Sequence, residues 1–194
     1  LERIELLVDG TLVHAVSIGR DGDVLTLTKE PDGSEESWLV LKTDAAARAE
    51  ELDLRARFPM LVELDRSAAV TVAIPLDDRP FEGLLYAYLP TEQSSRLPMH
   101  VNADFFPHPN RRAIVLTGEQ HDRYWNELLL EAAATAIAEN FVMLSGRIGA
   151  RRLWEIGSSA LALRGEGAFA IFWDRFAETA RGYNCSWSVE DEWC

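Results

Sequence analysis

The chain has 194 residues, 47% of them hydrophobic and 26% charged, which suits one large domain or two small ones with a buried core and excludes an intrinsically disordered protein. Acidic residues outnumber basic ones by 32 to 19, and the net charge of −13 argues against a surface for nucleic acid or for an anionic membrane. The sequence lacks an apolar run of about 18 residues and the basic-then-apolar start of a signal peptide, so we expect a soluble, cytoplasmic protein.

The N-terminal part alternates apolar and polar side chains between regularly spaced turns. Asp-Gly pairs at 9–10 and 21–22 and a Pro-Asp-Gly-Ser turn at 31–34 separate four such runs. An Asp-Gly pair between alternating strands is a strong hairpin signal. The pattern therefore predicts a four-stranded antiparallel meander over residues 2–42.

A short helix and two further β-rich runs follow the meander. Strong helix formers occupy residues 45–54, with Thr43 or Asp44 as the cap. The runs 68–74 and 83–89 are separated by turn-forming residues and each ends at a proline, so they predict a second hairpin.

A third β-rich run lies beyond a polar loop. The loop occupies residues 91–98, and the run occupies residues 99–105. Its apolar residues alternate with Asn102 and Asp104, which predicts a strand with these two polar side chains on its other face.

The last third of the chain has helical spacing. Thr117 and Gln120 are spaced as a capping box and predict a long helix over 119–144 that buries one apolar stripe. Two further helices are predicted at 150–156 and 167–180. We expect the aromatic side chains of the second one to be part of the core: Phe169, Phe172, Trp173 and Phe176.

Strands followed by helices predict an α+β fold. We expect an antiparallel meander and a mixed sheet in the N-terminal two thirds, packed against C-terminal helices. Two units are predicted, residues 1–66 with the meander and the short helix, and residues 67–194 as an α+β domain. One continuous domain over 1–194 is the alternative.

The two ends of the chain carry further information. Cys185 and Cys194 both lie near the C-terminus and exclude a disulfide framework.

The basic residues are almost all arginines. Only Lys29 and Lys42 are lysines, and this arginine bias is typical of a GC-rich bacterial genome. The chain opens without Met and stops without a polar tail, so we interpret it as a piece of a longer protein.

The sequence carries none of the common signatures of reaction chemistry: no nucleophile elbow, phosphate loop, dinucleotide fingerprint or zinc-protease motif. Carboxylate pairs at 35–36 and 77–78 lie in predicted turns, where solvated charge is the ordinary role. We predict no metal site, because the spacing of the candidate ligands matches no known pattern: His14, His100, His108, His121, Cys185 and Cys194.

One loop has the residues of an anion clamp. Two prolines and Asn110 stiffen the segment after the 99–105 strand, and Arg111 and Arg112 follow directly. A rigid pair of guanidinium groups is well shaped to hold phosphate oxygens. In so acidic a chain, the same arginines are equally able to balance nearby carboxylates.

Four short motifs occur in an order that resembles sacsin and its bacterial relatives, which carry ATPase modules similar to heat shock protein 90. The motifs are Gly-Leu-Leu-Tyr-Ala-Tyr-Leu-Pro-Thr at 83–91, Leu-Pro-Met-His-Val-Asn-Ala-Asp-Phe at 97–105, Asn110-Arg111-Arg112, and Trp-Asn-Glu-Leu-Leu-Leu at 125–130. In that family a nucleotide-binding domain of the GHKL type precedes this region. The present chain has neither its Asn-bearing magnesium helix, nor its Asp-x-Gly-x-Gly motif, nor its glycine-rich lid.

The resemblance implies a fold similar to the second domain of GHKL ATPases and a non-catalytic middle or transducer domain. In such ATPases the second domain supplies a basic residue that reaches the γ-phosphate when the domains close. Arg111 or Arg112 is the implied phosphate sensor, with Asn110 shaping the turn. ATP and Mg²⁺ are then bound by the missing N-terminal domain of the same chain. Client proteins or a second copy are the other implied partners, with no cofactor in this fragment.

The alternative is a protein–protein interaction module with no nucleotide role, which uses its sheet or its aromatic C-terminal helix. Exposed side chains at Trp187 and Trp193, or internal ion pairs of Arg111 and Arg112, favour that alternative. An independent hydrolase is disfavoured, because no nucleophile and base occur in a recognisable motif.

Overall fold

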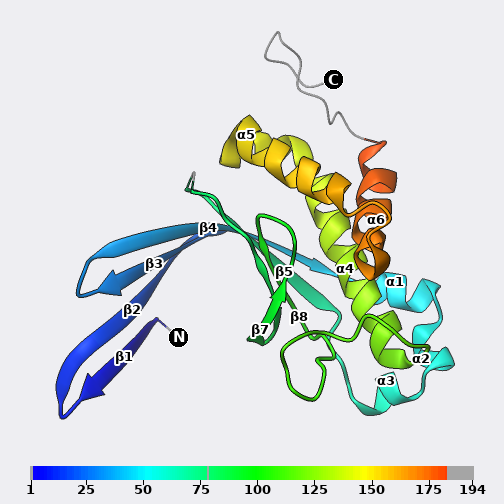
Figure 1. The fold of residues 1–194 in the computed structure, drawn as a ribbon, viewed down its shortest axis with the longest axis horizontal. Helices are drawn as coiled ribbons and strands as arrows, with labels where there is room; N and C mark the ends of the chain where they lie inside the picture. The colour runs from blue at the N-terminus through cyan, green and yellow to red at the C-terminus, as the bar shows by residue number, and fades with distance from the viewer. Residues whose placement is uncertain (1, 78, 183–194) are drawn as a thin grey trace, which may run out of the picture.

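The structure is a computed structural model that describes residues 2–77 and 79–182. A single eight-stranded sheet has the strand order β1-β2-β3-β4-β5-β8-β6-β7. The helices α4, α5 and α6 gather on one side of the molecule, and the first strands extend away from them (Figure 1). The predicted α+β class with a mixed sheet and C-terminal helices is confirmed, while the division at residue 66 stays a prediction.

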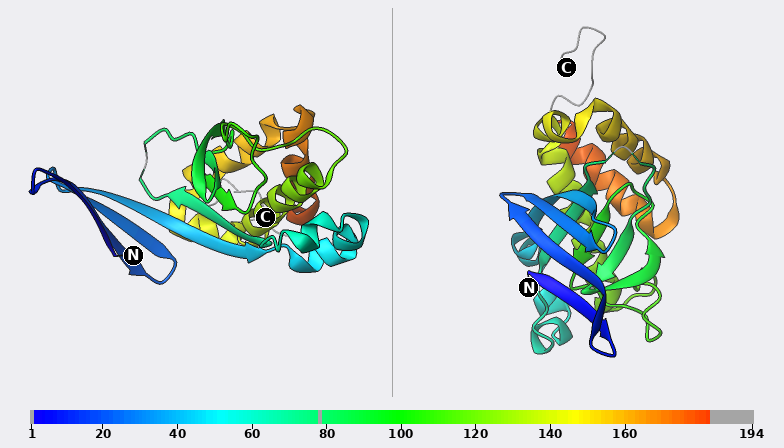
Figure 2. Two further views of the ribbon diagram at one scale, coloured as in Figure 1. Left: turned by 90° about the horizontal axis from the view of Figure 1, so that it is seen from below. Right: turned by 90° about the vertical axis from the view of Figure 1, so that its left-hand side faces the viewer.

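The first four strands form the predicted antiparallel meander. They are β1 (Arg3–Val8), β2 (Thr11–Asp21), β3 (Val24–Glu30) and β4 (Ser34–Asp44). Figure 2 shows them as a curved arm that leaves the body of the molecule. Arg147 of α5 binds Asp23, at the β2–β3 turn, with nitrogen–oxygen distances of 2.6 and 3.1 Å.

The strands of the body pair differently from the prediction. β5 (Ala69–Pro75) lies between β4 and β8 (His100–Ala103), antiparallel to both. β6 (Leu84–Ala87) is antiparallel to β7 (Leu89–Ser94) and parallel to β8. The predicted hairpin of 68–74 with 83–89 is therefore wrong, and the first half of the predicted loop at 91–98 is a strand.

The turn at Tyr88 and the burial of β8 explain why β6 pairs with β7 and β8. Tyr88 takes a left-handed conformation, with φ of 62°, and turns the chain directly from β6 into β7. The other side of β6 then accepts β8, whose Val101 is fully buried and packs in the core beside Val72 of β5.

The short helices after β4 differ in length from the prediction. α1 (Ala46–Glu51) is shorter than the predicted 45–54, and the carboxylate of Asp44 accepts a hydrogen bond of 2.6 Å from the Ala46 N–H. Two single-turn helices, α2 (Leu54–Arg57) and α3 (Met60–Glu63), were not predicted.

The predicted long helix at 119–144 is interrupted. α4 (His121–Glu139) and α5 (Phe141–Ala162) meet at Asn140 with a bend of 81°. Asn140 leaves the helical conformation, and its side chain donates to the carbonyl oxygen of Ala136 at 2.8 Å, which satisfies a group at the helix end. Gln120 is the residue before α4 and makes no capping bond, so the predicted capping box is also wrong.

The remaining helices follow the prediction more closely. The predicted helix at 150–156 lies in the second part of α5, directly after a kink at Gly149, whose φ of 78° and ψ of 156° are not helical. A 3₁₀ turn (Gly167–Phe169) and α6 (Ala170–Ala180) cover the predicted 167–180. Phe172 and Phe176 are buried, and Phe169 and Trp173 pack partly buried against the core, as expected.

The core lies between the sheet and α4. Trp125, Leu128 and Leu129 of α4 are fully buried in one cluster with residues of β4, β5 and β8, and α6 packs on α4. Burying one such side chain stabilises the fold by about 1.5–3 kcal/mol. No single helix within the described residues is long and apolar enough to cross a membrane, and α4 and α5 have the required length and composition only when taken together, as a pair bent by 81°.

Gly83 sits where no side chain fits. A Cβ atom there would lie 1.7 Å from the carbonyl oxygen of Met99 and 2.7 Å from Oγ of Ser95. We expect Gly83→Ala to lower the free energy of unfolding by about 3 kcal/mol or more, because the backbone must move. Urea unfolding measures this change.

Gly146→Ala is the matched control, because its Cβ would meet nothing within 4 Å inside α5. It is expected to stabilise the protein by roughly 0.5–1 kcal/mol through helix propensity. Equal effects of the two substitutions would contradict the close packing at Gly83.

Candidate functional site: an arginine loop after strand β8

Two neighbouring side chains of α4 hold the chain that leaves β8. The indole N–H of Trp125 donates to the carbonyl oxygen of Asp104 at 3.1 Å. The amide of Asn126 accepts from the Phe106 N–H at 2.7 Å and donates to the carbonyl oxygens of Phe106 and Val115, both at 2.8 Å. Both side chains are fully buried, so these bonds replace the water that the backbone groups would otherwise need.

A partly buried ion pair also holds this stretch. Asp104 is buried and pairs with Arg66, and its second carboxylate oxygen accepts from the Ser67 N–H at 3.1 Å. The Arg66 guanidinium also lies 4.1 Å from the centre of the Phe106 ring. Asp104 was expected on the face opposite the apolar residues, and Arg66 and the Ser67 N–H offset the cost of burying its charge.

The chain reverses its direction tightly within this loop. Pro107 and Ile114 form a bridge, and the His108 carbonyl oxygen accepts from the Arg111 N–H at 2.7 Å. The Asn110 side chain accepts from the Arg112 N–H at 3.0 Å. Arg111 has a φ of 56°, a left-handed conformation that costs a residue other than glycine about 1–2 kcal/mol. The loop therefore presents the two arginines in a fixed backbone geometry.

The two arginines at the end of the loop contact different strands. Arg111 donates from Nη2 to the carbonyl oxygen of Ala87, at the end of β6, at 3.2 Å. Arg112 pairs with Glu92 of β7, with Nε and Oε2 2.6 Å apart. The structure thus places both candidate sensors and Asn110 on one loop, but it directs the guanidinium groups to different partners within the chain.

The same loop covers the outer edge of β7. The Glu92 N–H donates to the Arg112 carbonyl oxygen at 2.9 Å, and the Gln93 side chain accepts from the Ile114 N–H at 2.8 Å. The first of these bonds uses a backbone N–H that an edge strand would otherwise offer to another chain. The arginine loop therefore covers the outer edge of β7 at Glu92 and Gln93.

Sequence reasoning missed the structural role of His100, which it considered only as a metal ligand. His100 lies in an aromatic cluster, stacked on Trp38 at 5.2 Å and edge-on to Phe81 at 4.8 Å and Tyr86 at 5.0 Å. Its Nδ1 accepts from the Leu84 N–H at 2.9 Å and so ties β6 to β8. Burial lowers the pKa of His100, which favours the neutral ring that this bond requires.

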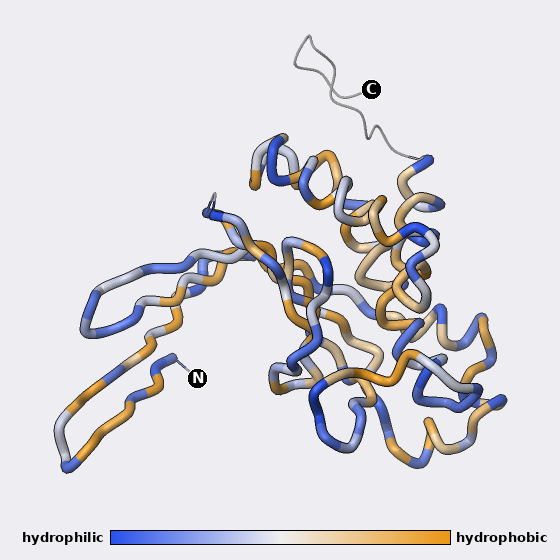
Figure 3. The backbone as a smooth tube through the Cα atoms, in the orientation of Figure 1, coloured by the Kyte–Doolittle hydropathy of each residue, from blue (hydrophilic) through white to orange (hydrophobic). Residues whose placement is uncertain are grey.

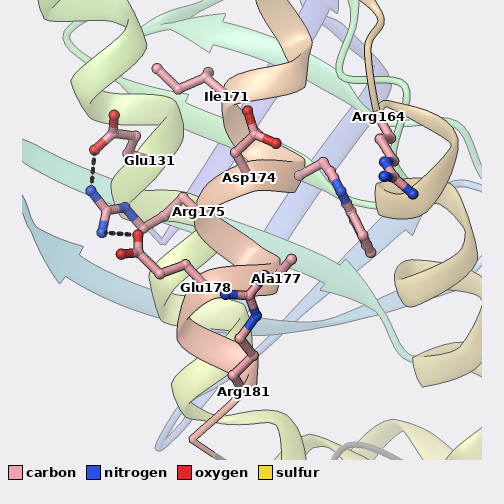
Figure 4. A pocket seen from close by; sticks show the side chains of 9 residues that line it. Glu131, Arg164, Ile171, Asp174, Arg175, Ala177, Glu178 and Arg181 are labelled. Atoms are coloured by element: carbon pink, nitrogen blue, oxygen red, sulfur yellow. Dashed lines mark hydrogen bonds and ion pairs between the residues drawn. The ribbon is translucent and has the colours of Figure 1, made fainter.

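A polar hollow of about 720 Å³ lies on the helical side of the molecule. Figure 4 shows Arg175 between Glu131 and Glu178, at 2.9 and 2.8 Å, while Arg164 and Arg181 line another part of the hollow. The paired charges connect α4 with α6, which is a structural role.

The remaining candidate residues are those considered as metal ligands and those near the C-terminus. Among the residues that the structure describes, no three His, Cys, Asp or Glu side chains gather in a group able to hold a metal ion. Cys185, Cys194, Trp187 and Trp193 lie outside the described residues, so the expectations that rest on them stay predictions.

No family model matches the chain, and no match was found among the curated proteins or the solved structures compared with it. The resemblance to sacsin-like proteins therefore depends on the sequence motifs alone. The geometry of the arginine loop does not depend on that resemblance.

Asn126→Ala tests the hold of α4 on the loop. The substitution leaves two buried backbone groups of Phe106 and the half-buried carbonyl oxygen of Val115 without their partner, and a buried group without a partner costs about 1–3 kcal/mol. We expect a loss of roughly 3 kcal/mol in the free energy of unfolding and faster hydrogen exchange at the Phe106 amide. Asn140→Ala, which removes one half-exposed helix-end bond, is the control and is expected to cost less.

His100 gives the stability a pH dependence of known sign. Because burial lowers the pKa of His100 in the folded state, the unfolded state binds more protons between that pKa and 6.5. The free energy of unfolding is therefore expected to fall as the pH drops below about 6.5, by at most about 1.4 kcal/mol per pH unit for one proton.

Urea unfolding at pH 7.5, 6.5 and 5.5 measures this dependence. His100→Asn is expected to flatten it, and His108→Asn, in the exposed loop, is expected to leave it unchanged. A dependence that survives His100→Asn would assign the effect to another group.

Proposed function

We propose that this chain is the middle, transducer-type domain of a sacsin-like, heat shock protein 90-related ATPase of the bacterial cytoplasm. In this proposal its fold is similar to the second domain of GHKL ATPases. It is not catalytic alone and couples ATP and Mg²⁺, bound by a preceding domain of the same protein, to conformational change or client handling. The observation that carries the proposal is the braced loop with Arg111 and Arg112, at the position where the resemblance implies a γ-phosphate sensor.

The internal bonds of the arginines are weak enough to be exchanged for a phosphate. The side chains of Arg112 and Glu92 are 66% and 65% exposed, and exposed ion pairs contribute about 0–1 kcal/mol. The bond of Arg111 to the Ala87 carbonyl oxygen uses one of its five N–H donors. Phosphate oxygens accept paired, charge-assisted bonds from guanidinium groups, so an arriving γ-phosphate can replace Glu92 at little cost.

An interaction module without a nucleotide role is the second candidate. The ion pair of Arg112 with Glu92 and the bond of Arg111 to a backbone oxygen favour it, because both arginines already have partners within the chain. The two candidates differ in whether the guanidinium groups affect ATP turnover.

The first check is the coding sequence upstream of Leu1. An Asn-bearing helix and a glycine-rich lid there would support the proposal, and an unrelated preceding domain would count against it.

The decisive measurement is steady-state ATP turnover of the intact protein with Arg111→Ala or Arg112→Ala. We expect a fall of tenfold or more in at least one variant, or about 1.4 kcal/mol of transition-state stabilisation, with losses near 10³-fold typical of arginines that act on a transferred phosphoryl group. Arg164→Ala, at an exposed arginine beyond the end of α5, is the matched control and is expected to leave turnover unchanged.

Arg111→Gly separates the side chain from the backbone, since glycine accepts the left-handed conformation without strain. Equal losses in Arg111→Ala and Arg111→Gly assign the effect to the guanidinium group. Unchanged turnover with Arg111→Ala and Arg112→Ala, in folded protein, would remove the phosphate role and leave the interaction module.

A further inference from the structure

One peptide unit at the end of β6 is held by side chains on both of its sides. The carbonyl oxygen of Ala87 accepts from Nη2 of Arg111 at 3.2 Å, and the N–H of Tyr88 donates to Oδ1 of Asn102 at 3.2 Å. These two backbone groups belong to the same rigid plane, because the peptide bond between Ala87 and Tyr88 joins them. A rotation of this plane therefore moves both hydrogen bonds at once.

Tyr88 and Arg111, which meet at this peptide, both have an unusual backbone conformation. Tyr88 has a φ of 62° and Arg111 a φ of 56°. The left-handed region is unfavourable for a bulky aromatic residue and persists only where the surrounding structure holds it. Part of that hold comes from the buried Thr91, whose hydroxyl group donates to the Leu85 carbonyl oxygen at 2.8 Å across β6 and β7. Strained residues of this kind concentrate at sites that bind ligands.

The backbone of the arginine loop is fixed by contacts that do not involve the Arg111 side chain. The tip of the loop is hydrophilic, and the chain that follows it is apolar (Figure 3). Ile114 and Leu116 of that apolar stretch are buried in the core, and the Arg112 carbonyl oxygen accepts from the Glu92 N–H at 2.9 Å. These contacts bring Arg111 to the end of β6, but they leave the direction of its guanidinium group to the bond with Ala87.

The bond with Ala87 leaves Arg111 able to bind a ligand. Within the described residues, Nε and Nη1 of Arg111 have no hydrogen-bond partner. The guanidinium group is planar and rigid, so a bond at Nη2 also restricts the directions of the other N–H groups. An arginine side chain that is ordered in advance loses less conformational entropy when a phosphate group binds.

We infer that Asn102 is a positioning residue of the arginine loop: it orients the Ala87–Tyr88 peptide, whose carbonyl oxygen holds the guanidinium group of Arg111 in place for a phosphate group. The inference rests on the proposed function, since it concerns a phosphate bound at Arg111. Asn102 is half-buried in β8 and does not contact Arg111 itself, so its effect passes through the shared peptide plane.

NMR and hydrogen exchange on this chain test whether Asn102 orders Arg111. We expect Asn102→Ala to speed exchange at the Tyr88 amide by about tenfold or more and to lower the order parameter of the Arg111 Nε–H group. Asn102→Asp keeps an acceptor oxygen and is expected to restore both values. Thr71→Ala is the matched control, because Thr71 lies opposite Asn102 on β5, and it is expected to change neither value.

Urea unfolding checks that each variant is folded. An unchanged order parameter of Arg111 in folded Asn102→Ala would overturn the inference, whatever the chain does in the intact protein. An order parameter that Asn102→Asp does not restore would overturn it as well, because the acceptor oxygen would then not be the cause.

ATP turnover of the intact protein tests what the positioning does. We expect Asn102→Ala to lower kcat by about tenfold with KM changed by less than about twofold, and Thr71→Ala to leave both unchanged. In an Arg111→Ala background, Asn102→Ala is expected to cause no further loss, because the group that it positions is already absent. A purely structural role of Asn102 would instead add its own loss to that of Arg111→Ala.

The outcomes separate this inference from the proposed function. Full turnover in Asn102→Ala, or an additive loss in the double variant, would overturn the inference alone. Full turnover in Arg111→Ala with a loss in Arg112→Ala would also overturn it and leave the proposed function standing. Full turnover in both arginine variants would overturn both.

Discussion

The side chain of Asn126 is the interaction on which both the packing and the arginine loop depend. It satisfies backbone groups of the buried Phe106 and the half-buried Val115, and the neighbouring Trp125 does the same for Asp104. Because these bonds run from α4 to the chain beyond β8, the helix cannot shift without releasing the loop. The position of Arg111 and Arg112 is therefore set by a helix that is itself fixed in the core.

Local patterns predicted the parts of the fold whose partners are near in sequence. The meander was predicted because its turns carry Asp-Gly pairs, and α6 because its aromatic residues have helical spacing. The parallel pairing of β6 with β8 was missed, since nothing in either strand encodes a partner beyond an intervening strand. The break at Asn140 was missed because the apolar spacing continues through it and only the amide side chain marks the helix end.

The candidate site was predicted in its residues but not in its contacts. Prolines and adjacent arginines are visible in sequence, so the stiff loop was expected, and the turn bond of Asn110 to the Arg112 N–H fits that expectation. The partners Glu92 and Ala87 belong to strands that were predicted as a loop or assigned to another hairpin, so no sequence pattern pointed to them. His100 carried no signal of its role, because its aromatic neighbours come from three separate segments.

The arginine loop and the β1 strand lie at opposite edges of one sheet, and this separation makes them electrostatically independent. Adjacent strands lie about 4.8 Å apart, so the first and last strands of the eight are separated by roughly 30 Å. Charges at that distance are screened at physiological salt, where the Debye length is about 8 Å. A charge that binds at the arginine loop therefore leaves the electrostatics of the β1 edge unchanged.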